Sequence, residues 1–109
     1  MPIVDQGASA TVFCAVWHKD PDRHDLVRSH AAALEAQTAP VEAVYVFDGG
    51  DEPPVDLPGV HVIAPDPLTI YAAWNLATQV ATADHLMNCN LDDRLWPAVA
   101  TCVARFQAA

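Results

Sequence analysis

Four short hydrophobic runs are spaced along the chain, and each is followed by polar or turn-forming residues. The runs lack the strict polar alternation of a strand with one solvated face, so they predict short strands that are buried on both faces. The predicted strands are residues 11–17, 42–47, 60–64 and 85–90. The pattern therefore indicates a sheet that lies inside the protein.

Hydrophobic residues recur at helical spacing in other segments of the chain. A first helix is predicted over residues 25–37, and a second follows Thr69, which is a suitable N-cap. A third helix is predicted from Pro97, because proline suits the first turn of a helix. The residues predicted to face the core are Leu26, Val27, His30, Ala31 and Leu34 in the first helix; Ile70, Ala73, Trp74, Ala77, Val80 and Ala81 in the second; and Val99, Cys102, Val103 and Phe106 in the third.

The order of these elements favours a single α/β domain with a mostly parallel four-stranded sheet and helices on both faces, in a three-layer Rossmann-like arrangement. In such sheets ligands bind at the carboxyl ends of the strands. Three polar loops follow predicted strands at that edge, at residues 18–22, 48–53 and 91–97. We therefore expect a functional site where these three loops meet.

The charge of the chain limits the classes of ligand. Lys plus Arg is 5 and Asp plus Glu is 14, which gives a formal net charge of −9. Nucleic-acid surfaces and docking on anionic lipid both need clustered positive charge, so neither is expected. A phosphorylated ligand stays compatible with this charge if a divalent metal accompanies it. No hydrophobic run approaches the length of a membrane span, so no transmembrane segment is expected.

The cysteines indicate the cellular setting. Cys14, Cys89 and Cys102 form no CxxC pair and lie in hydrophobic runs, which predicts three buried thiols. The odd number of cysteines and the lack of a secretory leader favour a reducing, cytoplasmic location.

Acidic residues stand at two of the strand ends. Asp92 and Asp93 would suit an oxygen-liganded Mg²⁺ or Mn²⁺ that also binds substrate phosphates, but the pair taken alone favours a solvated turn before the last helix. Asp48, before two glycines, could accept hydrogen bonds from a base or sugar, or belong to an ordinary Asp-Gly turn. The five histidines show no metal-ligand spacing, and His30 is predicted to be a core residue.

Three stretches, taken in order, carry a family resemblance over about residues 11–106. TVFCAVWHKDPDRHDLVRSHAAALEAQT is similar to an opening strand, polar turn and helix, and VEAVYVFDGGDEP to a second strand with a D-D-G-S type loop. TIYAAWNLATQVATADHLMNCNLDDRL is similar to a helix that reads I-Y-x-A-W-N and a strand that ends N-x-D-D-R. Together they resemble the first half of the family 2 glycosyltransferases, which have the GT-A fold and bind a nucleotide-diphosphate sugar.

The resemblance implies roles for particular residues. Asp92 would hold the Mn²⁺ or Mg²⁺ that bridges the donor diphosphate, with Asp93 as the acid that follows it, and Asp48 would contact the base. The implied metal ligands are thus Asp92 and Asp93, and the implied donor-binding residues are Ala15, Trp17, Asp48, Asn75, Asn90 and Asp92.

The chain also departs from the family pattern. Asn90 stands at the first carboxylate of the family's D-x-D motif, Phe47 where many members have an aspartate, and Trp74 where many have a basic residue. The family's acceptor site and catalytic base belong to a second half, so no residue here is matched to a catalytic role. The resemblance therefore implies a truncated GT-A nucleotide-sugar-binding domain, residues 1–109 with a core of about 11–107, from an enzyme that transfers sugar to an acceptor hydroxyl.

Two other classes of function are compatible with the pattern. The chain could be a non-catalytic GT-A-like interaction domain, and a half-fold would expose surfaces that favour self-association. A phosphotransfer receiver domain also pairs acids at strand ends. It needs a lysine at a strand end, however, and the single lysine, Lys19, lies in the first loop.

Overall fold

The computed structural model describes residues 2–108, with side chains to residue 105, and has the predicted α/β architecture. All pairs of neighbouring strands are parallel, and the strand order is β3-β2-β1-β4. The prediction of a mostly parallel, four-stranded, Rossmann-like sheet flanked by helices is therefore confirmed. The elements are β1 Ala10–Val16, α1 Arg23–Glu35, β2 Val41–Phe47, β3 Val60–Ile63, α2 Ile70–Val80, β4 Leu86–Asn88 and α3 Val99–Ala108.

The chain reverses its direction across the sheet between β1 and β4. From β1 it proceeds outward to β2 and then to β3, and it returns through α2 to place β4 on the other side of β1. A reversal of this kind opens a crevice at the carboxyl ends of the strands, which is the usual ligand site of open α/β sheets.

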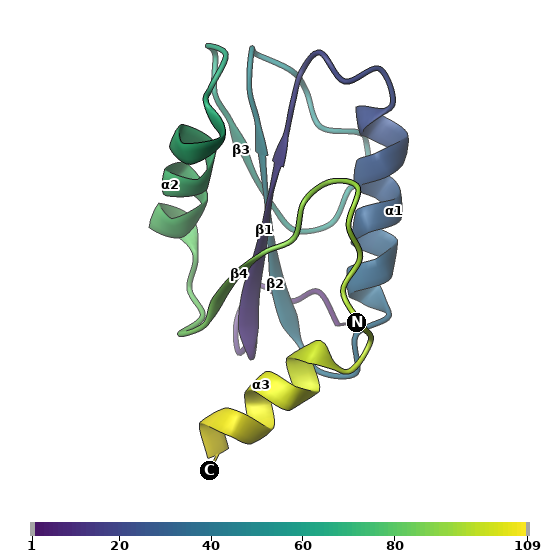
Figure 1. The fold of residues 1–109 in the computed structure, drawn as a ribbon, viewed down its shortest axis with the longest axis vertical. Helices are drawn as coiled ribbons and strands as arrows, with labels where there is room; N and C mark the ends of the chain where they lie inside the picture. Colours follow the sequence, from purple (N-terminus) through teal and green to yellow (C-terminus); the bar gives the residue numbers. More distant parts are fainter. Residues whose placement is uncertain (1, 109) are drawn as a thin grey trace.

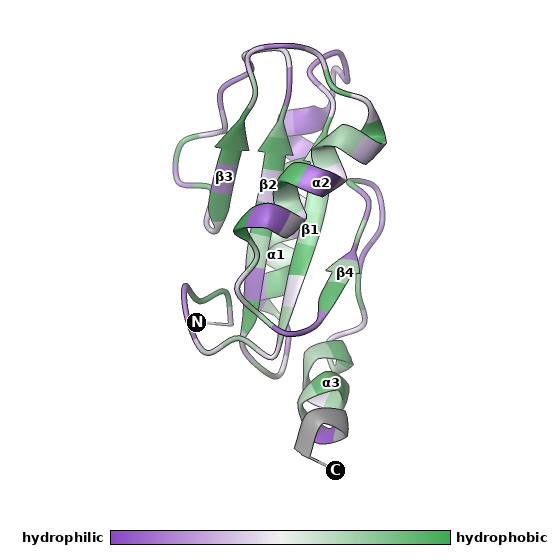
Figure 2. Ribbon diagram, turned by 90° about the vertical axis from the view of Figure 1, so that its left-hand side faces the viewer, coloured by the Kyte–Doolittle hydropathy of each residue, from purple (hydrophilic) through white to green (hydrophobic). Residues whose placement is uncertain are grey.

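Helices cover both faces of the sheet, with α1 on one face and α2 on the other (Figure 1). Alternate residues of β2 point to the two layers: Tyr45 and Phe47 pack with α1, whereas Val44 and Val46 pack with α2. Figure 2 shows the resulting hydrophobic colouring along the strands. Continuous apolar runs in β1 and β2 thus arise because these two strands are central and buried on both faces.

The outer strands are less buried than predicted. β3 is mostly half-buried, and β4 is a three-residue edge strand with two exposed residues, shorter than the predicted 85–90. Ile70 and Val80, predicted to face the core from α2, are also largely exposed. The cause is position: an edge strand has a neighbouring strand on one side only, and the short α2 packs mainly against β1 and β2.

The prediction for α3 was wrong in its start and in the burial of Cys102. The helix begins at Val99 and Ala100 is buried, Val99 and Val103 are half-buried, and Cys102 is exposed. The predicted core position of Phe106 lies outside the described side chains. Figure 1 shows that α3 extends beyond the end of the sheet.

Gln37 attaches α3 to the end of α1. Its amide nitrogen donates to Trp96 O (2.7 Å), and its amide oxygen accepts from Ala100 N (3.0 Å). Gln37 is itself buried, and it satisfies one of the free backbone amides that begin every helix.

Cys14 and Cys89 are buried, as predicted. In the described part of the chain, no helix has the length and hydrophobicity needed to cross a membrane.

Candidate functional site

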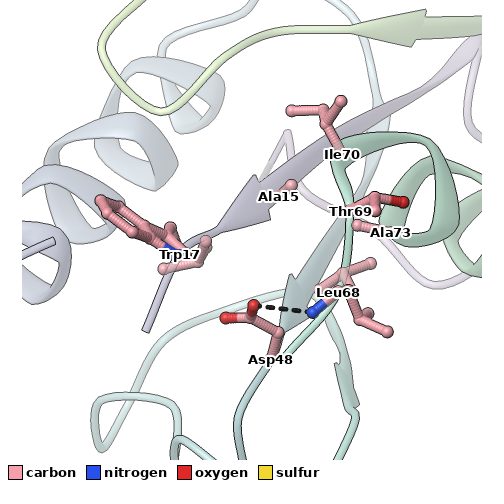
Figure 3. A pocket seen from close by; sticks show the side chains of 9 residues that line it. Ala15, Trp17, Asp48, Leu68, Thr69, Ile70 and Ala73 are labelled. Carbon is pink, nitrogen blue, oxygen red and sulfur yellow. Dashed lines mark hydrogen bonds between the residues drawn. The ribbon is translucent and has the colours of Figure 1, made fainter. Parts of the chain in front are cut away.

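A cavity of about 160 Å³ lies at the carboxyl ends of β1 and β2, on the face of the sheet that α2 covers. Its walls come from the ends of these two strands and from the first turn of α2 (Figure 3). The lining residues are Ala15, Val16, Trp17, Val46, Asp48, Leu68, Thr69, Ile70 and Ala73. The predicted edge of the sheet therefore does contain a hollow.

Small and large side chains together give the cavity its shape. Ala15 and Ala73 face each other across the layer between β1 and α2, and their short side chains leave room between the elements. Trp17 follows β1, is among the lining residues and is 57% exposed. Thr69 caps α2 by accepting from Ala72 N (3.1 Å), which confirms its predicted role. The result is an apolar hollow with one exposed aromatic ring at its mouth.

Asp48 connects the three segments that surround the cavity, and its side chain is almost fully buried. One carboxylate oxygen accepts from His18 N (2.8 Å) and from His18 Nδ1 (2.9 Å). The other oxygen accepts from Leu68 N (3.0 Å). Since a carboxylate can only accept, the His18 ring carries its proton on Nδ1. Asp48 thus binds the loop after β1 to the segment that leads into α2.

The next residue explains part of the Asp-Gly sequence. Gly49 has a φ of +61°, and a Cβ there would lie 2.7 Å from Cγ of His18. A side chain at this position would therefore be strained by the backbone and would displace the His18 ring. The sequence allowed two interpretations of Asp48, a ligand contact or an Asp-Gly turn. The two are compatible, because the turn holds the carboxylate at the cavity.

Burial and hydrogen bonding act in opposite directions on Asp48. Burial raises the pKa of its carboxyl, but the hydrogen bonds from Leu68 and His18 outweigh burial, and the pKa is lowered from the ordinary value of 3.8. Asp48 is therefore ionised at neutral pH. Nearby, hydrogen bonds from Arg23 likewise hold the pKa of Asp51 below its ordinary value.

The predicted metal ligands occupy a separate turn after β4, which we call the acid turn (residues 90–93). It is closed by a hydrogen bond from Asp93 N to Asn90 O (2.9 Å), and the side chains of Asp92 and Asp93 are exposed. Leu91 packs against the core on the α1 face, opposite to the face that holds the cavity. Within residues 2–108, no three or more His, Cys, Asp or Glu side chains gather in a way that could hold a metal.

The structure thus brings together some of the predicted site residues and separates others. Ala15, Trp17 and Asp48 line one cavity. Asn75 is exposed on α2 and is not among the lining residues. The sequence reasoning missed His18, and it missed the contribution of the residues around Thr69. For the residues around Thr69, the only signal was the predicted N-cap, which places the start of a helix at the carboxyl edge of the sheet. For His18, the signal was its place in the predicted loop 18–22.

No family model matches the sequence of this chain, and no curated protein matches it. The functional interpretation therefore depends on the geometry of the cavity and on the motifs quoted above.

Proposed function

We propose that this chain binds a nucleotide-diphosphate sugar at the carboxyl edge of its sheet, as the donor-binding region of a family 2 glycosyltransferase with the GT-A fold. The supporting observation is the meeting of Ala15, Trp17 and Asp48 at one cavity. Ala15 and Trp17 lie at the end of β1 whereas Asp48 follows β2, and the family resemblance implies a donor-binding role for all three.

The chemistry of the cavity suits a nucleobase. The exposed Trp17 indole offers a stacking surface, which is worth about 1–3 kcal/mol per base. Asp48 is ionised and makes three hydrogen bonds, which leaves acceptor capacity for a base N–H. Pockets for whole drug-sized ligands have roughly 300–1,000 Å³. A hollow of about 160 Å³ would therefore receive only one part of the donor, and we assign it to the base.

The rest of the donor would need a divalent cation. The formal charge of −9 disfavours an unaccompanied diphosphate. Two adjacent exposed carboxylates, Asp92 and Asp93, are oxygen ligands of the kind that Mg²⁺ and Mn²⁺ use while keeping waters and substrate phosphates. Asn90 is less suited, since its side-chain oxygen already accepts from Asn88 Nδ2 (2.9 Å). Such a cation would neutralise charge on the departing diphosphate.

The proposal is tested by isothermal titration of UDP, GDP and dTDP, each with and without Mn²⁺. At least one nucleotide should bind, more tightly with the metal. Trp17→Ala should weaken binding about tenfold because the stacking surface is lost. Trp96→Ala is the matched control: Trp96 is 79% exposed but lies beside α3, at the opposite edge of the sheet, so binding should be unchanged.

Two outcomes would contradict the proposal. If none of the three nucleotides binds in either condition, the donor site is wrong. If Trp17→Ala and Trp96→Ala weaken binding equally, the cavity is not the base site. Asp92→Asn tests the metal separately, since it should remove the gain from Mn²⁺ without changing metal-free binding.

A second function, as an interaction domain that associates with itself, is favoured by one exposed surface. β4 ends the sheet with an unpaired edge and Leu86 on it is exposed, and Ile70 and Tyr71 are exposed at the start of α2. We expect a reversible dimer in sedimentation velocity at increasing concentration. Leu86→Lys should abolish it, whereas Val55→Lys, in the loop before β3, should not. A chain that stays monomeric at all concentrations would exclude this function.

A further inference from the structure

His18 is fixed beside the cavity at three points. Its backbone N–H and its ring Nδ1–H donate to the same carboxylate oxygen of Asp48 (2.8 Å and 2.9 Å), and Asp48 is itself buried. The ring also packs over Gly49, where a Cβ would lie 2.7 Å from Cγ of His18. Asp48 and the residue before His18, Trp17, both line the cavity, so the His18 ring has a defined position next to it.

The partner of Nδ1 decides what the other ring nitrogen can do. Asp48 is ionised and can only accept, so Nδ1 carries the proton, and Nε2 of the uncharged ring has a lone pair. Among the described residues, Nε2 of His18 has no hydrogen-bond or ion-pair partner, and the side chain is 21% exposed. His18 therefore offers a hydrogen-bond acceptor in a fixed position beside the cavity.

A histidine with a purely structural role is bound differently in this fold. His30 of α1 is 1% exposed, its Nδ1 lies 2.8 Å from the hydroxyl of Tyr45, and its Nε2 lies 2.9 Å from Cys89 O. Both nitrogens of His30 are used, which confirms the prediction that it is a core residue. His18 commits one nitrogen to the described part of the fold and leaves the other for a ligand.

We infer that His18 is a specificity-determining residue, whose Nε2 accepts a hydrogen bond from a ribose hydroxyl of the bound nucleotide. The inference rests on the base site of the proposed function and does not depend on a metal. A hollow of about 160 Å³ has room for the base alone, so the ribose must lie outside it. The ribose is bonded directly to the base, and the ring centroids of Trp17 and His18 are 6.4 Å apart. A base that stacks on Trp17 therefore brings its ribose close to the His18 ring.

The chemistry of Nε2 selects a hydroxyl over the other exposed parts of a nucleotide. Ionised phosphate oxygens only accept hydrogen bonds, so they cannot pair with a ring nitrogen that also accepts. A ribose hydroxyl can donate, and the 2′-hydroxyl is the group that distinguishes ribonucleotides from deoxyribonucleotides. We therefore expect the chain to bind a ribonucleoside diphosphate in preference to an analogue that lacks the hydroxyl.

The wild-type chain alone gives the first test, by isothermal titration of UDP, 2′-deoxy-UDP and 3′-deoxy-UDP without metal. A buffer at pH 8 lies above the range in which histidine normally takes up a second proton. One of the two deoxy analogues should bind roughly threefold to tenfold more weakly than UDP, which is the effect of one hydrogen bond. This comparison needs no variant, so it does not depend on whether a substituted chain folds.

His18→Asn separates the ligand contact from the structural role of the residue. The amide nitrogen of asparagine can replace Nδ1 as a donor to Asp48, but no atom replaces Nε2. The variant should bind all three nucleotides with the same affinity, which should equal that of the wild type for the weaker deoxy analogue. His85→Asn is the matched control: His85 directly precedes β4, at the amino end of the sheet, so the preference for UDP should persist.

Equal affinity of the wild type for UDP and both deoxy analogues would overturn the inference and leave the base site standing. A preference for UDP that survives in His18→Asn would also overturn it, because another residue would then contact the hydroxyl. The same holds if His18→Asn binds none of the three nucleotides, since the loss of one hydrogen bond is too small to abolish binding. A wild type that binds no nucleotide would overturn the base site itself, and this inference with it.

Discussion

Replacing Phe47 with aspartate should leave the chain unfolded at neutral pH. Phe47 is the last residue of β2, is fully buried, and packs in the core between the sheet and α1. Loss of a buried phenylalanine costs about 3–5 kcal/mol, and an unpaired buried carboxylate costs several more. Small domains have a total stability of about 5–15 kcal/mol, so the sum consumes most or all of it.

Far-UV circular dichroism and urea unfolding would measure this loss. Phe47→Leu is the control, and it should cost less than about 1.5 kcal/mol because it keeps a hydrophobic side chain of similar size. The substitution is informative because the family resemblance places an aspartate here in many members. A well-folded Phe47→Asp variant would mean that β2 turns its other face to α1 and that the strand register is different.

Replacing Asp48 with alanine should lower the free energy of unfolding by about 3 kcal/mol. The three hydrogen bonds to its carboxylate are lost, and each bond to a charged group contributes about 1.5–3 kcal/mol. Water in the adjacent cavity can reach some of the freed donors, so the loss should lie well below the sum. Urea unfolding at pH 7 measures it, and Asp25→Ala, an exposed carboxyl on α1, should change stability little.

The same carboxylate should make stability depend on pH. The pKa of Asp48 is lowered in the folded state, so its contribution is complete above the ordinary value of 3.8 and is lost as pH falls through the lower, folded value. The gap in stability between the wild type and Asp48→Ala should therefore be constant from neutral pH to about pH 5 and shrink below pH 4. A gap that persists unchanged into strong acid would mean that ionisation of Asp48 does not contribute.

The central strands of the fold could be predicted from the sequence because both of their faces are buried in the hydrophobic core. β1 and β2 are flanked by strands and covered by α1 and α2, so nearly every residue is hydrophobic. β4 and α3 are different. Their hydrophobic residues follow the expected spacing. Leu86 is nevertheless exposed because β4 is an edge strand, and Cys102 is exposed on α3, which extends beyond the sheet. Spacing shows which residues share a face, not whether another element covers it.

The candidate site was predictable to the same extent. Trp17 and Asp48 could be assigned to one edge because parallel strands end together. The hydrogen bonds of Asp48 to His18 and Leu68 could not, since they depend on how two loops fold over the strand ends. The position of the acid turn on the α1 face could also not be predicted from the spacing of hydrophobic and polar residues. It depends on His30 and Arg94, whose partners are backbone carbonyls that any sequence provides.

The short β4 has a consequence for the order in which the structure opens. β4 pairs with β1 through three residue pairs, although the two strands lie near opposite ends of the sequence. β1 and β2 share seven residue pairs and are separated in the sequence by one helix, α1. Closing the long segment between β1 and β4 costs more chain entropy than closing the segment between β1 and β2, and fewer hydrogen bonds between the strands offset that cost. β4 should therefore be the last strand to dock and the first to detach. The residues proposed to meet the metal are thus carried by the segment of the sheet with the lowest local free energy of opening.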